Sequence, residues 1–167
     1  AELAVAHMLA LSRHLQRADA STRAGEWKRS TFVGSEFTGK TVGVVGYGTI
    51  GRIVASRCLG LKTRVVAYDP FVTREVFEQH GVEPLDLDEL LAQSDYVTLH
   101  CPLNEKTRNL LDARRLALMK PDARLVNCAR GGIVDEQALA AALQSGKLAG
   151  AALDVFEHEP PKGSLLL

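Results

Sequence analysis

The chain has 167 residues, of which 46% are hydrophobic and 24% are charged, and its 20 basic residues are balanced by 20 acidic ones. This is the composition of a globular protein, and it argues against intrinsic disorder and against a general nucleic-acid-binding surface. The length predicts one domain with its own hydrophobic core. No apolar run approaches the roughly 18 residues of a membrane span, and Glu2 and Arg13 interrupt the first apolar stretch, which argues against a signal peptide.

The three cysteines, Cys58, Cys101 and Cys128, lie far apart in the sequence. An odd and widely spaced set predicts neither a disulfide framework nor a CxxC metal site. We therefore expect a reducing, cytoplasmic location and no bound metal.

Residues 1–20 have the composition of a connecting helix, and no capping residue precedes them. The apolar stripe of this helix, which includes Leu3, Met8 and Leu11, is broad enough to pack on more than one neighbour. Two interpretations remain open: a core helix of this domain, or a helix that joins it to another domain or a second subunit. We expect the chain to be one domain of a longer protein that forms a homodimer or a larger homo-oligomer.

Residues 21–39 are polar and form an expected ordered connection, in which Trp27, Phe32 and Phe37 could serve an interface. From residue 40 to residue 156, short apolar runs alternate with helix-like segments. The apolar runs cover residues 41–46, 64–69, 96–100, 124–128 and 150–155. Their apolar residues are consecutive, which is typical of parallel strands buried on both faces. This order predicts a doubly wound α/β sheet in three layers, with helices on both faces.

Two acidic residues are candidate helix N-caps. Asp86 precedes an apolar segment and has Glu89 three residues later, which is the pattern of a capping box. Asp135 precedes Leu139 and Leu143, which are spaced as on one face of a helix.

A glycine-rich turn at residues 46–51 matches GxGxxG, directly after the first apolar run and before a helical pattern. Gly46 permits a tight turn, Gly48 lets the backbone approach a pyrophosphate, and Gly51 allows close packing of helix on strand. The helix N-terminus adds free N–H groups and the positive end of its dipole. This context predicts a Rossmann-like dinucleotide-binding domain, although a merely structural turn would show the same spacing.

An acidic residue, Asp69, ends the second apolar run, about 20 residues beyond the glycine turn, as the dinucleotide fingerprint requires. A carboxylate here accepts hydrogen bonds from the ribose hydroxyls of NAD and repels the 2′-phosphate of NADP. Arg74 is the nearest downstream base and keeps NADP open as the weaker alternative. A purely local role of Asp69, in the turn before Pro70, is a further alternative.

The later apolar runs also end in chemically useful side chains. Because the carboxyl ends of parallel strands share one edge of the sheet, His100, Cys128 and Asp154 are expected beside the glycine turn. Arg130 follows the fourth run and precedes two glycines. An arginine aimed into this crevice could hold a carboxylate through two hydrogen bonds, whereas the alternative is an arginine on a surface loop.

Three longer runs, at residues 99–108, 127–136 and 150–160, resemble the signatures of the D-isomer-specific 2-hydroxyacid dehydrogenases. With the glycine turn and Asp69, the resemblance spans nearly the whole chain. It implies NAD as cofactor and a small 2-hydroxy or 2-oxo acid as substrate, with neither nucleic acid nor membrane as a partner. The expected cofactor-binding residues are Gly46, Gly48, Thr49, Ile50, Gly51, Asp69, His100, Cys101, Pro102, Cys128, Ala129, Arg130 and Asp154.

The resemblance implies two catalytic residues. Arg130 matches the arginine that binds the carboxylate and carbonyl of the oxo acid, and Glu159 matches the glutamate that holds a histidine and raises its pKa. A carboxylate does favour a charged imidazole, and carbonyl reduction needs a proton donor and a positive group. The family's histidine and its substrate-binding domain have no match in this chain, since neither His158 nor any other histidine fits. We therefore expect cofactor recognition without a complete active site.

Three functions remain open. The resemblance favours oxidation of D-3-phosphoglycerate in serine biosynthesis. The second possibility is a dehydrogenase of the same family that acts on glycerate, glyoxylate or lactate. The third is an NAD-sensing interaction module, as in co-repressors that share these motifs. The substrate-binding domain would discriminate among them, because residues that bind a substrate phosphate would lie there.

Overall fold

The computed structural model describes residues 1–167. Its centre is a six-stranded parallel sheet with the strand order β3-β2-β1-β4-β5-β6. The strands are β1 (Thr41–Val45), β2 (Arg64–Tyr68), β3 (Glu83–Pro84), β4 (Tyr96–Leu99), β5 (Arg124–Asn127) and β6 (Gly150–Leu153). The chain winds outward from β1 in both directions, so the predicted doubly wound sheet is confirmed.

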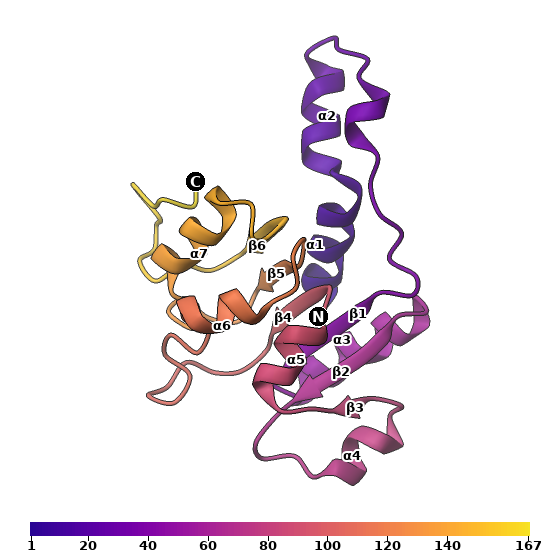
Figure 1. Cartoon of the computed structure of the whole chain (residues 1–167), viewed down its shortest axis with the longest axis vertical. Coiled ribbons are helices and arrows are strands. Elements are labelled where there is room, and N and C mark those ends of the chain that lie inside the picture. The colour runs from indigo at the N-terminus through magenta and orange to yellow at the C-terminus, as the bar shows by residue number, and fades with distance from the viewer.

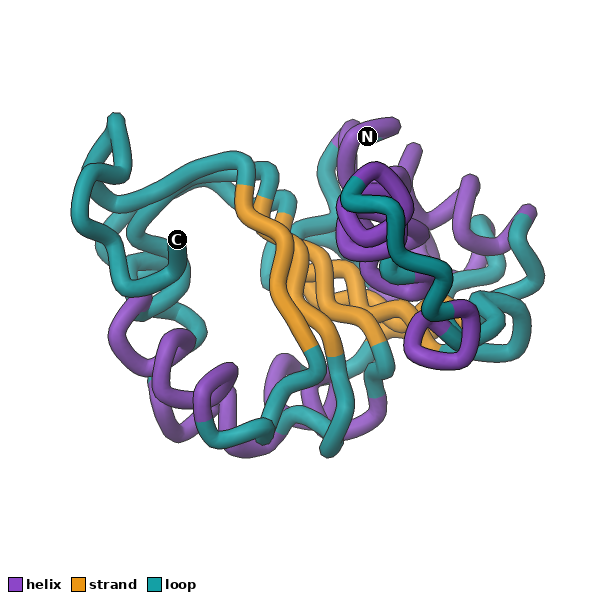
Figure 2. The backbone as a smooth tube through the Cα atoms, turned by 90° about the horizontal axis from the view of Figure 1, so that it is seen from above, coloured by secondary structure: helices purple, strands orange, loops and turns teal.

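Helices cover both faces of the sheet (Figure 2). They are α1 (Glu2–Arg13), α2 (Leu15–Arg23), α3 (Thr49–Gly60), α4 (Arg74–Gln79), α5 (Leu87–Gln93), α6 (Ala113–Leu118) and α7 (Glu136–Gln144), with a 3-10 turn η1 (Arg29–Phe32). Two hydrophobic clusters result, one between the sheet and α5, α6 and α7, and one between the sheet and α1, α3 and α4. Neighbouring strand residues such as Val44 and Val45 point into different clusters, which explains why the strand runs are continuously apolar.

The two expected helix caps differ in outcome. Asp135 is the N-cap of α7, and its Oδ1 accepts a hydrogen bond from Ala138 N at 3.0 Å. Asp86 occupies the N-cap position of α5 but makes no side-chain hydrogen bond there, so the expected capping box is not formed. The short helices α4 and α6 and the two-residue strand β3 were not predicted, because elements of this length have too few residues to show a periodic pattern.

The N-terminal helix breaks at His14, whose φ of 53° is left-handed, so α1 and α2 are separate and α2 extends to Arg23. Helix α1 packs on β5 and β6, and its residues Ala4 and Met8 are buried in the second hydrophobic cluster. Helix α2 has no buried residue and projects away from the sheet (Figure 1). None of the helices combines the length and apolarity needed to cross a membrane.

Three aromatic residues of the connection could have served an interface, but one of them, Phe37, is buried within this chain. It is 6% exposed and packs edge-on against Tyr96, with ring centroids 4.9 Å apart. Phe37 therefore anchors the connection to the sheet. Trp27 lies between α2 and η1 and remains 77% exposed. It is near the tip of residues 15–33, which we call the projecting segment (Figure 1).

Candidate functional site

The loops that follow β1, β2 and β4 begin side by side at the carboxyl edge of the sheet. Gly46 N donates a hydrogen bond to Tyr68 O at 2.8 Å, and His100 N donates to Val45 O at 2.7 Å. These bonds continue the strand pairing one residue beyond the strands. The glycine turn is thereby held between the loop that carries Asp69 and the loop that carries Cys101.

The glycine turn has the shape that a pyrophosphate requires. Gly46 has φ of 93°, and a Cβ there would meet the backbone of His100 and Cys101 at 2.7 Å. A Cβ on Gly51 would collide with the Gly46 carbonyl, whereas a Cβ on Gly48 would meet no protein atom within 4 Å. Gly48 is also the N-cap of α3 and makes no side-chain cap bond, so the first N–H groups of α3 face outward unpaired by a side chain. The residues present therefore fit a bound dinucleotide.

Asp69 has two hydrogen bonds within the protein. Its Oδ2 accepts from Tyr47 N at 2.8 Å, and its Oδ1 accepts from Phe71 N at 2.9 Å. The local role considered for Asp69 is thus real. It does not exclude ribose binding, because a carboxylate has about four lone-pair sites and this one is only partly buried.

Tyr47, which sequence reasoning left without a role, is fully buried behind the glycine turn. Its ring stacks on Phe77 of α4, with centroids 4.5 Å apart, and Arg52 Nε donates to its carbonyl at 3.1 Å. These contacts hold the turn on its buried side, while the space next to Gly48 on its other side stays open.

A cavity of about 360 Å³ lies in front of the turn. Six of the expected cofactor residues line it: Gly46, Gly48, Asp69, His100, Cys101 and Pro102. Sequence reasoning missed Phe71, Lys106 and Thr107, which also line it. Lys106 and Thr107 lie within residues 99–108, the run that resembles a family signature, and this resemblance was the available signal for them.

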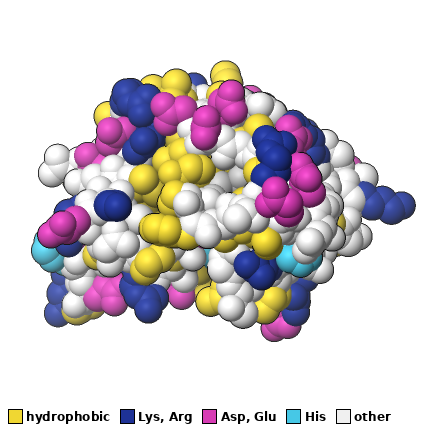
Figure 3. Space-filling view, turned by 90° about the horizontal axis from the view of Figure 1, so that it is seen from below, with side chains coloured by type: hydrophobic (Ala, Val, Ile, Leu, Met, Phe, Trp, Pro, Cys, Tyr) yellow, Lys and Arg dark blue, Asp and Glu magenta, His cyan; other side chains and the backbone are white.

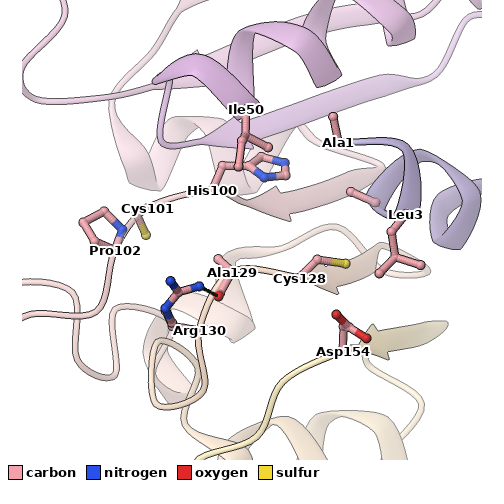
Figure 4. A pocket seen from close by; sticks show the side chains of 11 residues that line it. Ala1, Leu3, Ile50, His100, Cys101, Pro102, Cys128, Ala129, Arg130 and Asp154 are labelled. Carbon is pink, nitrogen blue, oxygen red and sulfur yellow. Dashed lines mark hydrogen bonds between the residues drawn. The ribbon is translucent and has the colours of Figure 1, made fainter.

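A second cavity, of about 400 Å³, continues along the same edge of the sheet (Figure 4). Its lining includes Ile50, His100, Cys101, Pro102, Cys128, Ala129, Arg130 and Asp154, all of which were expected at the cofactor. It shares His100, Cys101 and Pro102 with the first cavity. Ala1, Leu3 and Ala4 of the α1 region also line it and were missed, because nothing local in a helical sequence indicates that its first turn reaches a distant loop. Thr49, Gly51 and Glu159 line neither cavity.

Arg130 stands on a loop that a buried side chain shapes. Asn127, at the end of β5, donates from Nδ2 to Arg130 O at 2.9 Å and accepts at Oδ1 from Ala129 N at 3.0 Å. The guanidinium of Arg130 is exposed and donates one hydrogen bond, to Ala129 O at 2.6 Å. Most of its donors are therefore available to an anion, which favours the functional interpretation over that of an incidental surface arginine.

Glu159 lies in the exposed loop after β6. Its Oε1 accepts a hydrogen bond from Phe156 N at 3.0 Å, and no histidine is hydrogen-bonded to its carboxylate. His158 is exposed and makes no hydrogen bond. The structure therefore places Glu159 on the same edge of the sheet as Arg130 but supplies it with no imidazole.

His100 is the one histidine that lines the cavities. Burial lowers its pKa from 6.5 to about 4. Thr98 Oγ1 and His100 Nε2 form a hydrogen bond of 3.0 Å. At neutral pH the ring is uncharged, so it is suited to lining a cofactor site and not to donating a proton.

The two cysteines of the cavities are not activated. Burial raises the pKa of Cys101, as does the charge of Asp69, and burial together with Asp154 raises the pKa of Cys128. Both therefore remain neutral thiols at pH 7. No group of three or more His, Cys, Asp or Glu side chains is arranged to hold a metal ion. On the face shown in Figure 3, acidic and basic side chains are interspersed around apolar ones, with no large patch of a single charge.

Comparisons with known proteins agree on one family. A model described as "D-isomer specific 2-hydroxyacid dehydrogenase, NAD binding domain" matches residues 5–167. The D-3-phosphoglycerate dehydrogenase of Methanocaldococcus jannaschii is 49% identical, over 100% of this chain and 32% of the relative, and that of Homo sapiens is 46% identical, over 100% and 31%. The chain thus spans about a third of the length of the curated relatives it matches.

Solved structures of the same family superpose closely. The pyruvate reductase of Chlamydomonas reinhardtii has a TM-score of 0.90 and 44% identity, covering 95% of this chain and 46% of that one. A glyoxylate reductase from Paecilomyes thermophila has a TM-score of 0.91 and 38% identity, covering 99% and 50%. The D-lactate dehydrogenase of Aquifex aeolicus, complexed with NAD and lactic acid, has a TM-score of 0.90 and 37% identity, covering 96% and 48%.

Proposed function

Because the chain belongs to the NAD-binding domains of the D-isomer-specific 2-hydroxyacid dehydrogenase family, we propose that it is the NAD-binding domain of an enzyme that oxidises D-3-phosphoglycerate. The product would be 3-phosphohydroxypyruvate, and the reaction would be a step of serine biosynthesis. The names of curated relatives that are 46–50% identical to this chain support this substrate. The observation that carries the proposal is the pair of connected cavities. One is lined by Gly48 and Asp69, the other by Arg130, and they share residues 100–102.

The first cavity would hold the adenosine and pyrophosphate parts of NAD. Gly48 leaves room for the pyrophosphate, and the outward N–H groups at the start of α3, including those of Thr49 and Ile50, would donate to it. Asp69 would accept from the ribose hydroxyls with the lone pairs that Tyr47 and Phe71 leave free.

The second cavity would hold the nicotinamide and the reacting end of the substrate. When bound, NAD supplies the hydride acceptor at this position. Ile50, Cys128 and Ala129 would pack against the nicotinamide, because their side chains line the cavity and carry no charge at neutral pH. Arg130 would bind the carboxylate of the hydroxy acid and stabilise negative charge on the oxygen at C2.

Proton transfer requires a base for the hydroxyl group of the substrate. Glu159 would hold a histidine from a part of the protein outside residues 1–167 and raise its pKa, as a neighbouring carboxylate does. The same outside part would include the substrate-binding domain, and residues 40–156 would be the cofactor-binding core. Residues 1–20 would be the helix that connects this core to the outside part, and residues 21–39 would be the ordered connection from that helix to β1. The partial coverage of the relatives supports this division.

The complete protein would be a homodimer or larger assembly in the reducing cytoplasm. Helix α2 buries none of its residues within this chain, and the projecting segment exposes Leu15, Trp27 and Val33. Such a projecting segment with exposed apolar side chains is suited to contact a second subunit. The three cysteines are free, which supports a reducing compartment.

A second candidate is a dehydrogenase for another short hydroxy acid, since the structural relatives include pyruvate and glyoxylate reductases and D-lactate dehydrogenases. The test is NADH formation by the complete protein with D-3-phosphoglycerate, D-glycerate and D-lactate, and NADH consumption with glyoxylate. We expect the highest kcat/KM with D-3-phosphoglycerate. A preference for another acid would select the second candidate. NAD binding without a rate on any acid would instead indicate an NAD-sensing module.

A further inference from the structure

The loop that carries Glu159 is joined to the loop that carries Arg130 by backbone contact. A Cβ on Gly131 would overlap the carbonyl group of Phe156 and would lie 2.7 Å from Glu157 N. The two backbones therefore touch, and no side chain separates them. Since Phe156 N also donates to Glu159 Oε1, the orientation of Glu159 depends on where residues 156 and 157 lie.

A side chain of α7 helps to hold that contact in place. Glu136, the first residue of α7, accepts a hydrogen bond at Oε1 from Glu157 N at 2.7 Å. Helix α7 follows the Arg130 loop along the chain, and the backbone N–H of its cap Asp135 donates a hydrogen bond to Leu111 O at 3.1 Å, which fixes the start of the helix to the segment before α6. Glu136 thus ties the Glu159 loop to the first turn of α7.

The position of Glu136 favours a charged acceptor despite the acidic side chains around it. Glu136 lies in the first turn of α7, where the helix dipole stabilises a negative charge. Arg108 lies within 3.4 Å of the neighbouring Glu157 carboxylate and offsets part of the repulsion between the two acids. A partly buried carboxylate that accepts from a backbone N–H is also a stronger acceptor than a neutral group.

We propose that Glu136 is a positioning residue for the reaction: by holding Glu157 N it sets the place of Glu159, and through Glu159 the charge state of the histidine that moves the proton. This inference rests on the proposed function. Glu136 lines neither of the two cofactor cavities, so its effect would reach the reaction only through the loop.

The experiment compares Glu136→Ala and Glu136→Gln in the complete enzyme, with Gln137→Ala, a change at the adjacent residue, as the control. Gln retains the Oε1 acceptor and Ala removes it, while Gln137 is exposed on the same helical turn and makes no side-chain hydrogen bond. The measurements are kcat/KM against pH, the Kd for NAD and the fraction of folded protein. The pH profile is decisive, because loss of folded enzyme lowers the whole curve without moving its limbs.

We expect Glu136→Ala to lower kcat/KM by roughly tenfold or more, as small displacements of catalytic groups do. The limb of the pH profile that reports the histidine should move to lower pH, with the Kd for NAD unchanged. Glu136→Gln should keep the limb in its wild-type position, because it retains the acceptor, with only a small loss of rate from the weaker neutral acceptor. Gln137→Ala should retain the wild-type profile. If the limb of the pH profile does not move in Glu136→Ala, or if Glu136→Gln is as impaired as Glu136→Ala, this inference is overturned while the proposed function stands. A wild type inactive on every hydroxy acid would overturn the proposed function and this inference with it.

Discussion

The carboxylate of Asp69 accepts a hydrogen bond from the backbone N–H of Tyr47 at 2.8 Å. The residue expected to recognise ribose therefore also holds the glycine turn in its shape. The glycine turn and the end of β2 are therefore joined by a direct hydrogen bond. A change at either should affect cofactor binding, but for different physical reasons, and variants can separate them.

Gly48→Val should abolish NAD binding while leaving the fold intact. A Cβ at this position meets no protein atom, so the added side chain would occupy only the space in front of the turn. Isothermal titration with NAD measures the effect, and thermal unfolding checks the fold. Gly60→Val is the matched control, since Gly60 lies at the other end of α3 and a Cβ there also meets nothing within 4 Å. Equal NAD affinity in both variants would contradict the assignment of the turn.

Asp69→Ala should weaken NAD binding and narrow the preference for NAD over NADP. Each hydrogen bond to the charged carboxylate contributes roughly 1.5–3 kcal/mol, and removing the charge also removes the repulsion of a 2′-phosphate. The variant should in addition lose stability, because Tyr47 N and Phe71 N lose their acceptor. Affinities for both cofactors and urea unfolding give the two effects separately. An unchanged cofactor preference would assign the discrimination to another residue, with Arg74 the first to examine.

Asn127→Ala should lower the free energy of unfolding by about 1–3 kcal/mol, because a buried polar group left unpaired costs about that much. The buried group is Ala129 N, which loses its acceptor Asn127 Oδ1, while Arg130 O is less buried and can pair with water. Urea unfolding measures the change, with the exposed Gln137→Ala as control. Wild-type stability in the Asn127 variant would mean that the loop has other sufficient support.

The wild type should lose stability relative to His100→Gln as the pH falls from 6.5 toward 4. Burial is the main cause of the lowered pKa of His100, about 4 against 6.5, so between these values the unfolded chain binds a proton that the folded chain does not. Stability rises with pH wherever the unfolded state binds more protons, and above pH 6.5 this contribution is constant. The expected loss is on the order of 2 kcal/mol, below the full linkage value because the ring is only partly shielded from solvent. Urea unfolding measures the free energy of unfolding of both proteins across this pH range. If the two values change in parallel with pH, the expected titration of His100 is refuted.

Residues 1–167 alone should bind NAD without turning over a hydroxy acid. Arg130 and Glu159 are present, but no histidine is hydrogen-bonded to Glu159, and the ring of His100 is neutral at pH 7. Groups that act as a unit lose nearly all activity when one is missing. NADH absorbance with D-3-phosphoglycerate and shorter 2-hydroxy acids is the assay. A rate of roughly 1–1000 per second, ordinary for an enzyme, would show that the acid–base group lies within the chain. His158→Gln would then be the first variant to make.

Several features of this protein follow from short stretches of its sequence. Continuous apolar runs predicted five parallel strands, because strands buried on both faces cannot alternate with polar residues. The turn at residues 46–51 and the acid at Asp69 predicted the dinucleotide site, since glycine spacing and strand ends are local properties of the chain. Asp135 predicted the start of α7 for the same reason.

Other features depend on contacts between residues far apart in the chain, and only the tertiary structure decided them. Phe37 is buried because Tyr96 lies opposite it, and Asn127 shapes the Arg130 loop because β5 ends beneath it. The first turn of α1 lines the second cavity because the helix packs across β5 and β6. Glu136 reaches Glu157 because two backbones touch at Gly131. A residue's own neighbours in sequence determine its local conformation, but its packing partners are set by how the sheet brings separate loops to one edge.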